Sequence, residues 1–318
     1  MSVRDLILNA KKTAFSFEVL PPLKGNGIEA IYETIDQLRE FDPKYIDITT
    51  HRSELVYKTL DNGLFQCERV RQRPGTVAIA AAIKNKYGID VVPHVLCCDY
   101  SKFDTEYMLI DLDFLGIHDL LVLRGDKAKT DSVFKPKEDG YLHASELQDQ
   151  INRFNEGYFL DGSKRKFEMV EKFSYGVAGY PEKHEEAPNF GADLKRLKEK
   201  VDKGAGYIVT QMFFDNAKFY AFVDKCREAG IDVPIVPGLK PITTTRQLSV
   251  LPKTFHLDMP EELAEALSKC KTNDEAKQVG IEWCTMQAKD LKSHNVPCIH
   301  FYTMSTAASV KEIAKQVF

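Results

Sequence analysis

The sequence predicts an α/β protein that folds as one closed (β/α)8 barrel, the TIM-barrel architecture. Eight short β-rich runs alternate with longer amphipathic segments, and a further helix-like segment, 307–318, follows the eighth run. Such alternation is typical of parallel βα units. The runs lie at 15–20, 45–49, 90–96, 119–124, 175–180, 207–213, 234–239 and 298–303.

The segments between the runs carry the hydrophobic periodicity of helices. Segments 27–40 and 192–203 place apolar residues three and four positions apart, on one helix face. A doubly wound open sheet is the competing architecture. Against it, the first run is followed by Pro21-Pro22-Leu23-Lys24-Gly25 and not by the GxGxxG turn of dinucleotide-binding folds. The closed barrel is therefore favoured.

The chain length suits a single barrel. It has 318 residues, and such barrels run to about 250 residues plus insertions. No linker divides it, so we expect one catalytic domain over 1–318. The longest interruption, 127–173, lies between the fourth and fifth runs and is polar and charged, with one helix expected at 144–154. This pattern predicts a solvated excursion, which at the active face of a barrel could also serve as a lid.

Composition narrows the classes of function. The chain is 43% hydrophobic and 28% charged, which is ordinary for a globular protein. Its net charge of −4 does not indicate the basic surface that nucleic-acid binding needs. No apolar stretch approaches the roughly 18 residues of a membrane span, and the N-terminus has no signal-peptide core. The seven cysteines include an adjacent pair and no CxxC. We therefore expect reduced thiols in a cytoplasmic protein.

Polar residues recur where the runs end. The fourth run, in LLVLRGDKAK (120–129), stops at an Arg-Gly-Asp. A single strand that ends in this way needs no functional explanation, because Gly and Asp commonly form turns. In a barrel, however, catalytic groups lie at the C-terminal ends of the strands. The recurrence around the ring favours an active site. The set comprises Glu18, Thr49, His94, Arg124, Gly125, Asp126, Tyr180, His184, Gln211, Lys240, His300 and Tyr302.

Glu18 is the most informative of these residues. It lies inside an apolar run, where burial raises the pKa of a carboxyl group and suits it to general-acid work. A structural ion pair with a nearby Lys or Arg is the alternative. A zinc site would need His94, His184 and His300 to converge, because the chain has no HExxH. A Schiff-base aldolase would use Lys240. The chain has no GxSxG motif, which a serine hydrolase would need.

The ordered series of motifs resembles the methylenetetrahydrofolate reductase family, in its bacterial form of a catalytic domain alone. The resemblance runs from about residue 15 to residue 303, with a motif at nearly every strand end. Each motif is weak alone, and the ordered series is specific. The motifs are Phe17-Glu18-Val19-Leu20-Pro21-Pro22, Pro93-His94, Leu123-Arg124-Gly125-Asp126, Gly179-Tyr180-Pro181-Glu182-Lys183-His184, Ala192-Asp193-Leu194, Thr210-Gln211-Met212-Phe213-Phe214, Pro237-Gly238 and His300-Phe301-Tyr302-Thr303.

The resemblance implies a flavoprotein that binds FAD and works by ping-pong hydride transfer. NADH or NADPH reduces the flavin, and 5,10-methylenetetrahydrofolate then accepts hydride from flavin N5. The product, 5-methyltetrahydrofolate, supplies methyl groups for methionine synthesis. Homo-oligomers are frequent in the family. Because the chain ends soon after the eighth run, we expect no control by S-adenosylmethionine.

The resemblance also assigns residues. Glu18 matches the general acid that opens the imidazolidine ring, and Asp126 matches a carboxylate near the flavin and the pterin, where its charge would stabilise a cationic iminium. Residues that match folate or nicotinamide contacts are Gln211, Gln247 and Tyr302. Residues that match flavin contacts are Thr49, Thr50, His94, Leu123, Arg124, Gly125, Asp126, Ala144, Tyr180, His184, Asp193 and Lys200. No metal ligand is implied.

Asp193 and Lys200 are seven residues apart on one expected helix, so they share a face that suits an extended ligand, with Lys200 placed for a phosphate. A surface helix of ion pairs is the alternative.

Two stretches depart from the family pattern. After Thr49, where an aromatic residue and glycines are common, this chain reads Thr50-His51-Arg52-Ser53-Glu54. After Thr303 it reads Met304-Ser305-Thr306, where Asn-Arg is common, so the expected folate-binding arginine is missing. Two other functions stay open: a flavin-independent barrel lyase or aldolase, and a folate- or flavin-binding module without turnover.

Overall fold

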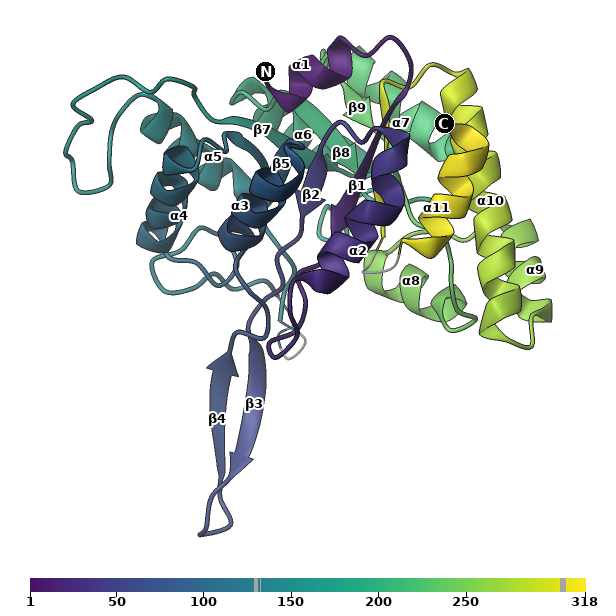
Figure 1. Ribbon diagram of the computed structural model, residues 1–318, viewed down its shortest axis with the longest axis horizontal. Coiled ribbons are helices and arrows are strands. Elements are labelled where there is room, and N and C mark those ends of the chain that lie inside the picture. The colour runs from purple at the N-terminus through teal and green to yellow at the C-terminus, as the bar shows by residue number, and fades with distance from the viewer. Residues whose placement is uncertain (129–130, 132, 304–306) are drawn as a thin grey trace.

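The computed structural model describes residues 1–128, 131, 133–303 and 307–318. Its main sheet is parallel throughout and curls around a central axis, with helices outside it (Figure 1). The order of strands around the sheet is β10-β11-β1-β2-β5-β6-β7-β8-β9. The strands are β1 (Ala14–Val19), β2 (Ile46–Ile48), β5 (Val91–Leu96), β6 (Asp119–Leu123), β7 (Ser174–Gly179), β8 (Tyr207–Thr210), β9 (Ile235–Val236), β10 (Gly238–Leu239) and β11 (Cys298–Tyr302).

The two ends of this order are halves of one interrupted strand. Pro237 separates β9 from β10, and proline has no N–H for the ladder. β9 pairs with β8 on one side, β10 pairs with β11 on the other, and the Pro237 carbonyl still accepts a hydrogen bond from His300 N at 3.0 Å. The barrel is therefore closed by eight strand segments. This confirms the predicted (β/α)8 fold and excludes the open sheet.

Helices surround the barrel, and no helix in the described ranges is both long and apolar enough to cross a membrane. The expected segments 27–40, 144–154, 192–203 and 307–318 correspond to α2, α5, α6 and α11, with bounds that differ by at most about two residues at each end. The helices are α1 (Val3–Leu8), α2 (Glu29–Leu38), α3 (Thr76–Tyr87), α4 (Lys102–Phe114), α5 (Ala144–Asn155), α6 (Phe190–Asp202), α7 (Asn216–Glu228), α8 (Gln247–Phe255), α9 (Glu261–Lys269), α10 (Asn273–Ser293) and α11 (Ala308–Val317), with a 3-10 turn at Arg39–Phe41.

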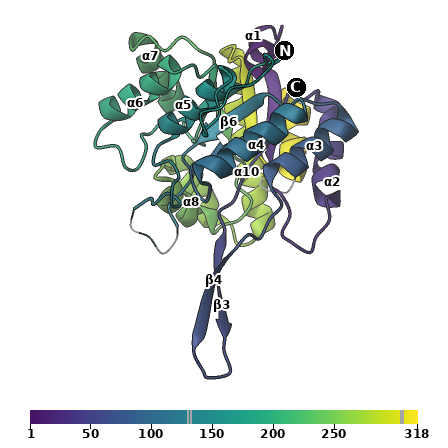
Figure 2. The ribbon, with the colours of Figure 1, turned by 90° about the vertical axis from the view of Figure 1, so that its left-hand side faces the viewer.

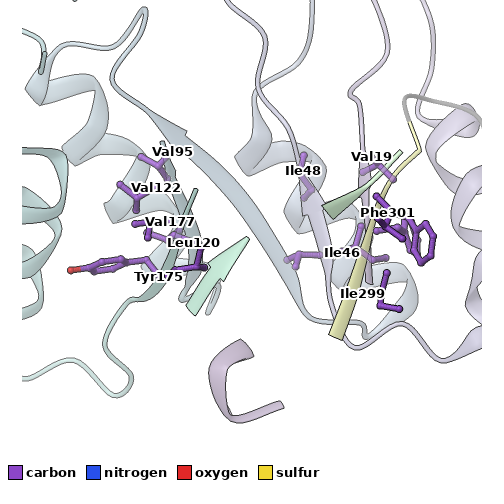
Figure 3. Close-up of a cluster of buried hydrophobic side chains, with 14 of the residues drawn as sticks. Val19, Ile46, Ile48, Val95, Leu120, Val122, Tyr175, Val177, Ile299 and Phe301 are labelled. Carbon is purple, nitrogen blue, oxygen red and sulfur yellow. The ribbon is translucent and has the colours of Figure 1, made fainter. Parts of the chain in front are cut away.

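Successive side chains of each strand point alternately outward, toward the helices, and inward, toward the barrel axis, because a strand has a two-residue period. On β1, Phe15, Phe17 and Val19 join the outer core, whereas Ser16 and Glu18 point inward. Figure 3 shows outward-facing side chains from neighbouring strands gathered in this outer layer, among them Ile46 and Phe301. Burial of this continuous apolar layer is the main source of the fold's stability.

The N-terminal end of the barrel is sealed by α1. The Val3 N–H donates to Asp119 Oδ1 at 2.9 Å, at the start of β6. Val3 and Ile7 pack beneath the inward-facing residues at the beginnings of the strands, including Tyr45 and Tyr207. The other members of this apolar cluster are Ala14, Val92, Leu121, Val209, Val236 and Cys298.

A two-stranded antiparallel hairpin, β3 (Glu54–Thr59) and β4 (Phe65–Val70), projects from the opposite end of the barrel (Figures 1 and 2). The sequence analysis did not predict it. The signal was present, because Asn62-Gly63 between β-rich runs is a strong hairpin marker, and Gly63 has φ +79°. At its root Arg69 contacts Asp99 at 3.0 Å.

Helix α5 lies within the expected excursion 127–173. It packs against β6 and α6, and Gln148 donates from α5 to the Lys200 carbonyl at 2.8 Å. The middle of that segment therefore belongs to the helical ring.

Candidate active site

Inward-facing polar residues meet at the C-terminal end of the barrel, the end from which the hairpin projects. Strand register places Glu18 opposite Asp47 on β2 and opposite Tyr302 on β11. Leu239 is opposite Phe301, so the next residue, Lys240, lies level with Tyr302. Four strand segments thus bring a carboxylate pair, a phenol and an amine to one level of the barrel.

Glu18 is buried, as its apolar run predicted, with 8% of its surface exposed. Burial raises its pKa to about 7, with a further rise from Asp47, while His94 and Lys240 act in the opposite direction. Its carbonyl accepts the Thr303 hydroxyl at 2.6 Å, which fixes the end of β1 against β11. A carboxyl group with this pKa is largely protonated just below neutral pH and can donate that proton.

His94 on β5 lies between two carboxylates. Its Nε2 is 3.7 Å from Glu18 Oε2 and 3.5 Å from Asp47 Oδ2. Burial alone lowers the pKa of His94, but Asp47 and Glu18 outweigh it and raise the pKa. His300 Nε2 lies 3.8 Å from the same Asp47 oxygen, Oδ2, and burial lowers the pKa of His300 to about 4. His94 is therefore the histidine that these carboxylates favour in its charged form.

Lys240 is a buried amine in the same layer, with 7% of its surface exposed. Burial lowers its pKa, and the Glu18 carboxylate acts against that decrease. The sequence analysis named Lys240 as the candidate for Schiff-base chemistry. Its place beside Glu18 also makes it a charge that acts on the carboxyl group.

The Arg124-Gly125-Asp126 motif forms a tight turn after β6. Gly125 has φ +82°, and a Cβ there would lie 2.5 Å from Cys98 Sγ, so the turn requires glycine. Arg124 pairs with Glu186 through Nη2 and Oε1 at 3.0 Å. The Asp126 carbonyl accepts Arg52 Nη1 at 2.8 Å.

A second group follows β7. The rings of Tyr180 and His184 meet edge to face with centroids 4.7 Å apart, and the His184 N–H donates to Asp193 Oδ2 at 2.9 Å. Burial raises the pKa of Tyr180, and Asp126 and Asp193 add to the increase, so this group lies within electrostatic range of the Arg-Gly-Asp turn.

Lys200, on α6, donates to the Ala178 carbonyl at 2.7 Å. Burial lowers its pKa to about 8.

The remaining predicted residues lie at or near the same end of the barrel. Thr49 follows β2, its neighbour Thr50 donates to the His94 carbonyl at 3.4 Å, Leu123 ends β6 and Ala144 begins α5. Tyr302 donates its hydroxyl to the Thr210 carbonyl at 2.6 Å, directly before Gln211. Gln247 instead uses its side-chain oxygen to accept Thr243 N at 2.7 Å, which closes its own loop. Met304-Ser305-Thr306 lie outside the described residues.

Asp47 is the member of this site that the sequence analysis missed. It is 0% exposed, in the middle of the apolar run 45–49. The signal was the one that identified Glu18, a carboxylate inside an apolar strand. Of the three histidines that the zinc alternative would need, His94 and His300 approach Asp47, whereas His184 packs against Tyr180. Among the described residues no group of three or more His, Cys, Asp or Glu is arranged to hold a metal.

The residues after β6 and β7 fit a dinucleotide such as FAD by their chemistry. Within the described part of the chain, the Lys200 ammonium donates to one acceptor, the Ala178 carbonyl, which leaves two N–H groups for phosphate oxygens. Arg124 adds a second cation, and the Tyr180–His184 pair offers an aromatic surface. The group thus offers the Lys200 ammonium, an Arg124 guanidinium that is paired with Glu186, and an aromatic surface.

Comparisons with known proteins agree with this geometry. The family profile described as "Methylenetetrahydrofolate reductase" matches residues 3–317. The probable methylenetetrahydrofolate reductase (NADPH) of Caenorhabditis elegans is 32% identical over 315 residues, which is 98% of this chain and 43% of that protein. The chain thus spans about half the length of such eukaryotic relatives. The 5,10-methylenetetrahydrofolate reductase of Escherichia coli strain K12 is 30% identical over 293 residues, 92% of this chain and 86% of that protein.

A solved structure supports the fold. A Clostridium thermocellum protein described as binding two copies of 5-methyl-5,6,7,8-tetrahydrofolic acid matches with TM-score 0.57 and 15% identity, over 99% of this chain and 97% of that one. At this identity the likeness shows the barrel fold alone. The family match over nearly the whole chain, with the bacterial relative, shows more: this chain belongs to the methylenetetrahydrofolate reductase family, a family of oxidoreductases.

Proposed function

We propose that this chain reduces 5,10-methylenetetrahydrofolate to 5-methyltetrahydrofolate, with FAD as bound cofactor and NADH or NADPH as reductant. The observation that carries the proposal is Glu18. It is a buried carboxyl group with a pKa raised to about 7, at the catalytic end of a barrel whose sequence belongs to this family. Reduction of a bridged methylene group needs an acid of this kind, because the carbon–nitrogen bond that opens must receive a proton.

In this proposal Glu18 gives its proton to the folate nitrogen that leaves the bridging carbon. The open form of the substrate is a cation, and Asp126, at the end of the Arg-Gly-Asp turn, stabilises it by its negative charge. Tyr302, whose hydroxyl donates to the Thr210 carbonyl, and Gln211, which follows Thr210, would contact the folate or the nicotinamide. Gln247 would act there through its amide nitrogen, because its oxygen is held by Thr243.

Bound FAD would supply hydride transfer between nicotinamide and folate in two separate half-reactions. Lys200 and Arg124 would hold its phosphates, and the Tyr180–His184 pair would lie against a ring. Thr49, Thr50, His94, Leu123, Gly125, Ala144 and Asp193 complete the proposed contact set. Under this proposal 1–318 acts as one catalytic domain, with 127–173 as an excursion beside the site.

The test is the visible spectrum of the purified protein, followed by two additions. We expect flavin absorption, bleaching by NADH or NADPH, and recovery of colour on addition of methylenetetrahydrofolate with one methyltetrahydrofolate formed per flavin. A colourless protein that cleaves carbon–carbon bonds would support the lyase reading through Lys240. A coloured protein that turns over neither with folate nor with menadione would be a binding module.

A further inference from the structure

The burial of the Asp47 carboxyl group needs a physical explanation. It is 0% exposed, and within the described residues neither of its oxygens has a hydrogen-bond partner. The Nε2 atoms of His94 and His300, the two rings that approach it, also lack one. A buried carboxylate without compensation is costly, so a neighbouring positive charge is required. Of the two rings, His94 lies nearer, at 3.5 Å against 3.8 Å.

His300 is not suited to carry that charge. Its Nδ1 lies 3.0 Å from the Ser16 hydroxyl, its ring stacks on Tyr45 with centroids 6.2 Å apart, and its lowered pKa keeps it neutral. The Asp47 and Glu18 carboxyl groups both approach Nε2 of His94, and both act to raise the pKa of that ring. Asp47 thus favours the protonated form of a ring whose Nε2 also lies 3.7 Å from Glu18 Oε2.

Resting on the function proposed above, we propose that Asp47 is a positioning residue for the proton donor. It holds His94 as an imidazolium against Glu18, so that His94 returns the proton that Glu18 gives to the substrate. The separations of 3.5 and 3.7 Å are slightly longer than hydrogen bonds, as contacts of catalytic groups often are before substrate binds.

The proton balance requires such a return. Each conversion of the bridged methylene group to a methyl group takes up one hydride, which the nicotinamide supplies, and one proton. The Glu18 O–H bond breaks and a folate N–H bond forms, which leaves a carboxylate. The His94 Nε2–H bond then breaks as the Glu18 O–H bond re-forms, and the neutral ring takes a proton from solvent. Asp47 exchanges no proton in this sequence, and its carboxylate favours the reprotonated ring.

Other charged and titratable groups face this pair. Lys240, after β10, acts on Glu18. The groups near enough to interact electrostatically with the pair are Glu18 on β1, His300, Tyr302 and Cys298 on β11, Tyr45 before β2 and Tyr207 on β8. Asp47 acts on both partners in the same direction, since its charge raises the pKa of His94 and that of Glu18. Loss of that charge therefore moves the protonated state of both groups to lower pH.

The test is Asp47→Asn, which keeps the shape and removes the charge. Asp119→Asn is the matched control, because Asp119 is a carboxylate at the other end of the barrel that contacts Val3. The first readout is the NMR titration of the His94 ring in labelled protein, with the signal assigned by its loss in His94→Gln. We expect the midpoint to move to lower pH in Asp47→Asn and to stay in Asp119→Asn. An unmoved midpoint in Asp47→Asn would overturn the proposal.

The second readout separates the two half-reactions by rapid mixing. In Asp47→Asn we expect flavin reduction by nicotinamide at the wild-type rate. The folate step should slow by about tenfold, less than the roughly 10²–10⁴-fold of a lost general acid. The rate of the folate step falls as the pH rises, and in Asp47→Asn this fall should begin at a lower pH than in the wild-type protein. Equal slowing of both steps, or an unmoved pH profile, contradicts the proposal.

The variant could fail to fold, or the wild-type protein could lack the proposed activity, and these two outcomes have different consequences. If Asp47→Asn fails to fold, the titration of the wild-type protein takes its place. The His94 midpoint is expected above the ordinary histidine value of about 6.5, and a midpoint at or below that value would overturn the proposal. If the wild-type protein does not reduce methylenetetrahydrofolate at all, the proposed function fails. The NMR titration still reports whether Asp47 holds His94 charged.

Discussion

The two ends of the barrel interior differ in chemistry although the same eight strand segments build both. At the N-terminal end, α1 covers an apolar cluster that contains Val3, Ile7, Tyr45 and Tyr207. At the C-terminal end the inward positions hold Glu18, Asp47, His94 and Lys240, all buried. Buried charges cost stability unless they are paired, whereas apolar contacts contribute it. One end is thus built for stability and the other for chemistry, as is usual in this fold.

The largest effect that would test this division is expected for Glu18→Gln. Glutamine keeps the size of the side chain but has no proton to donate near neutral pH. The folate half-reaction should fall by about 10²–10⁴-fold, while flavin binding and reduction by nicotinamide stay unchanged. Rapid mixing that follows bleaching and then recovery of the flavin resolves the two steps. Recovery at the wild-type rate would make Glu18 structural.

Ile7→Ala tests the opposite end of the barrel. Ile7, on α1, is buried in the apolar cluster at the N-terminal end of the barrel, and truncation of such a side chain costs about 2–5 kcal/mol of the free energy of unfolding. Both half-reactions of the folded variant should keep their wild-type rates. Urea unfolding measures the first quantity. A selective loss of the folate step in this variant would contradict the division between the two ends.

Asp126→Asn should have a smaller effect on rate. Its charge is proposed to stabilise the cationic form of the folate, so the folate step should slow by at least about tenfold, or roughly 1.4 kcal/mol. Reduction by nicotinamide should slow less. The glycine-dependent turn should survive, because the Asp126 contact to Arg52 is made by the backbone carbonyl. Equal losses in both steps would leave Asp126 as a cofactor anchor only.

Lys240→Met is expected to change the pH dependence of the folate step more than the maximal rate of that step. The Lys240 charge lowers the pKa of Glu18, so its removal raises that pKa and keeps Glu18 protonated to higher pH. The decline of the folate step at alkaline pH should therefore shift upward, opposite to the shift expected for Asp47→Asn. Lys240→Arg, which keeps the charge, is the control. A downward shift in Lys240→Met would contradict the electrostatic account.

Much of the fold could be predicted because it follows from local patterns. Alternation along each run identified the strands, and the apolar run around Glu18 predicted its burial. The same pattern around Asp47 was equally readable and was overlooked, as was the Asn62-Gly63 hairpin turn. The eight runs also gave the right strand count, although Pro237 divides the seventh into two short pieces.

Contacts across the barrel could not be predicted. That His94 Nε2 lies 3.5 Å from Asp47 and 3.7 Å from Glu18 depends on the stagger of three neighbouring strands, which no single run encodes. The pairing of Arg124 with Glu186 and the use of the Gln247 oxygen to close a loop likewise depend on how separate loops meet. The family resemblance implied Gln247, but the bond between its side-chain oxygen and Thr243 N depends on the fold of the loop.

The central claim is that Glu18 is a proton donor whose pKa is raised to about 7 by burial. The most direct measurement is the rate of the folate half-reaction in the wild-type protein as a function of pH, measured from the recovery of reduced flavin in single turnovers. Because the protonated form is the active one, the rate should be highest below pH 7 and fall as the pH rises through about 7. A rate that stays constant or increases across this range would contradict the account.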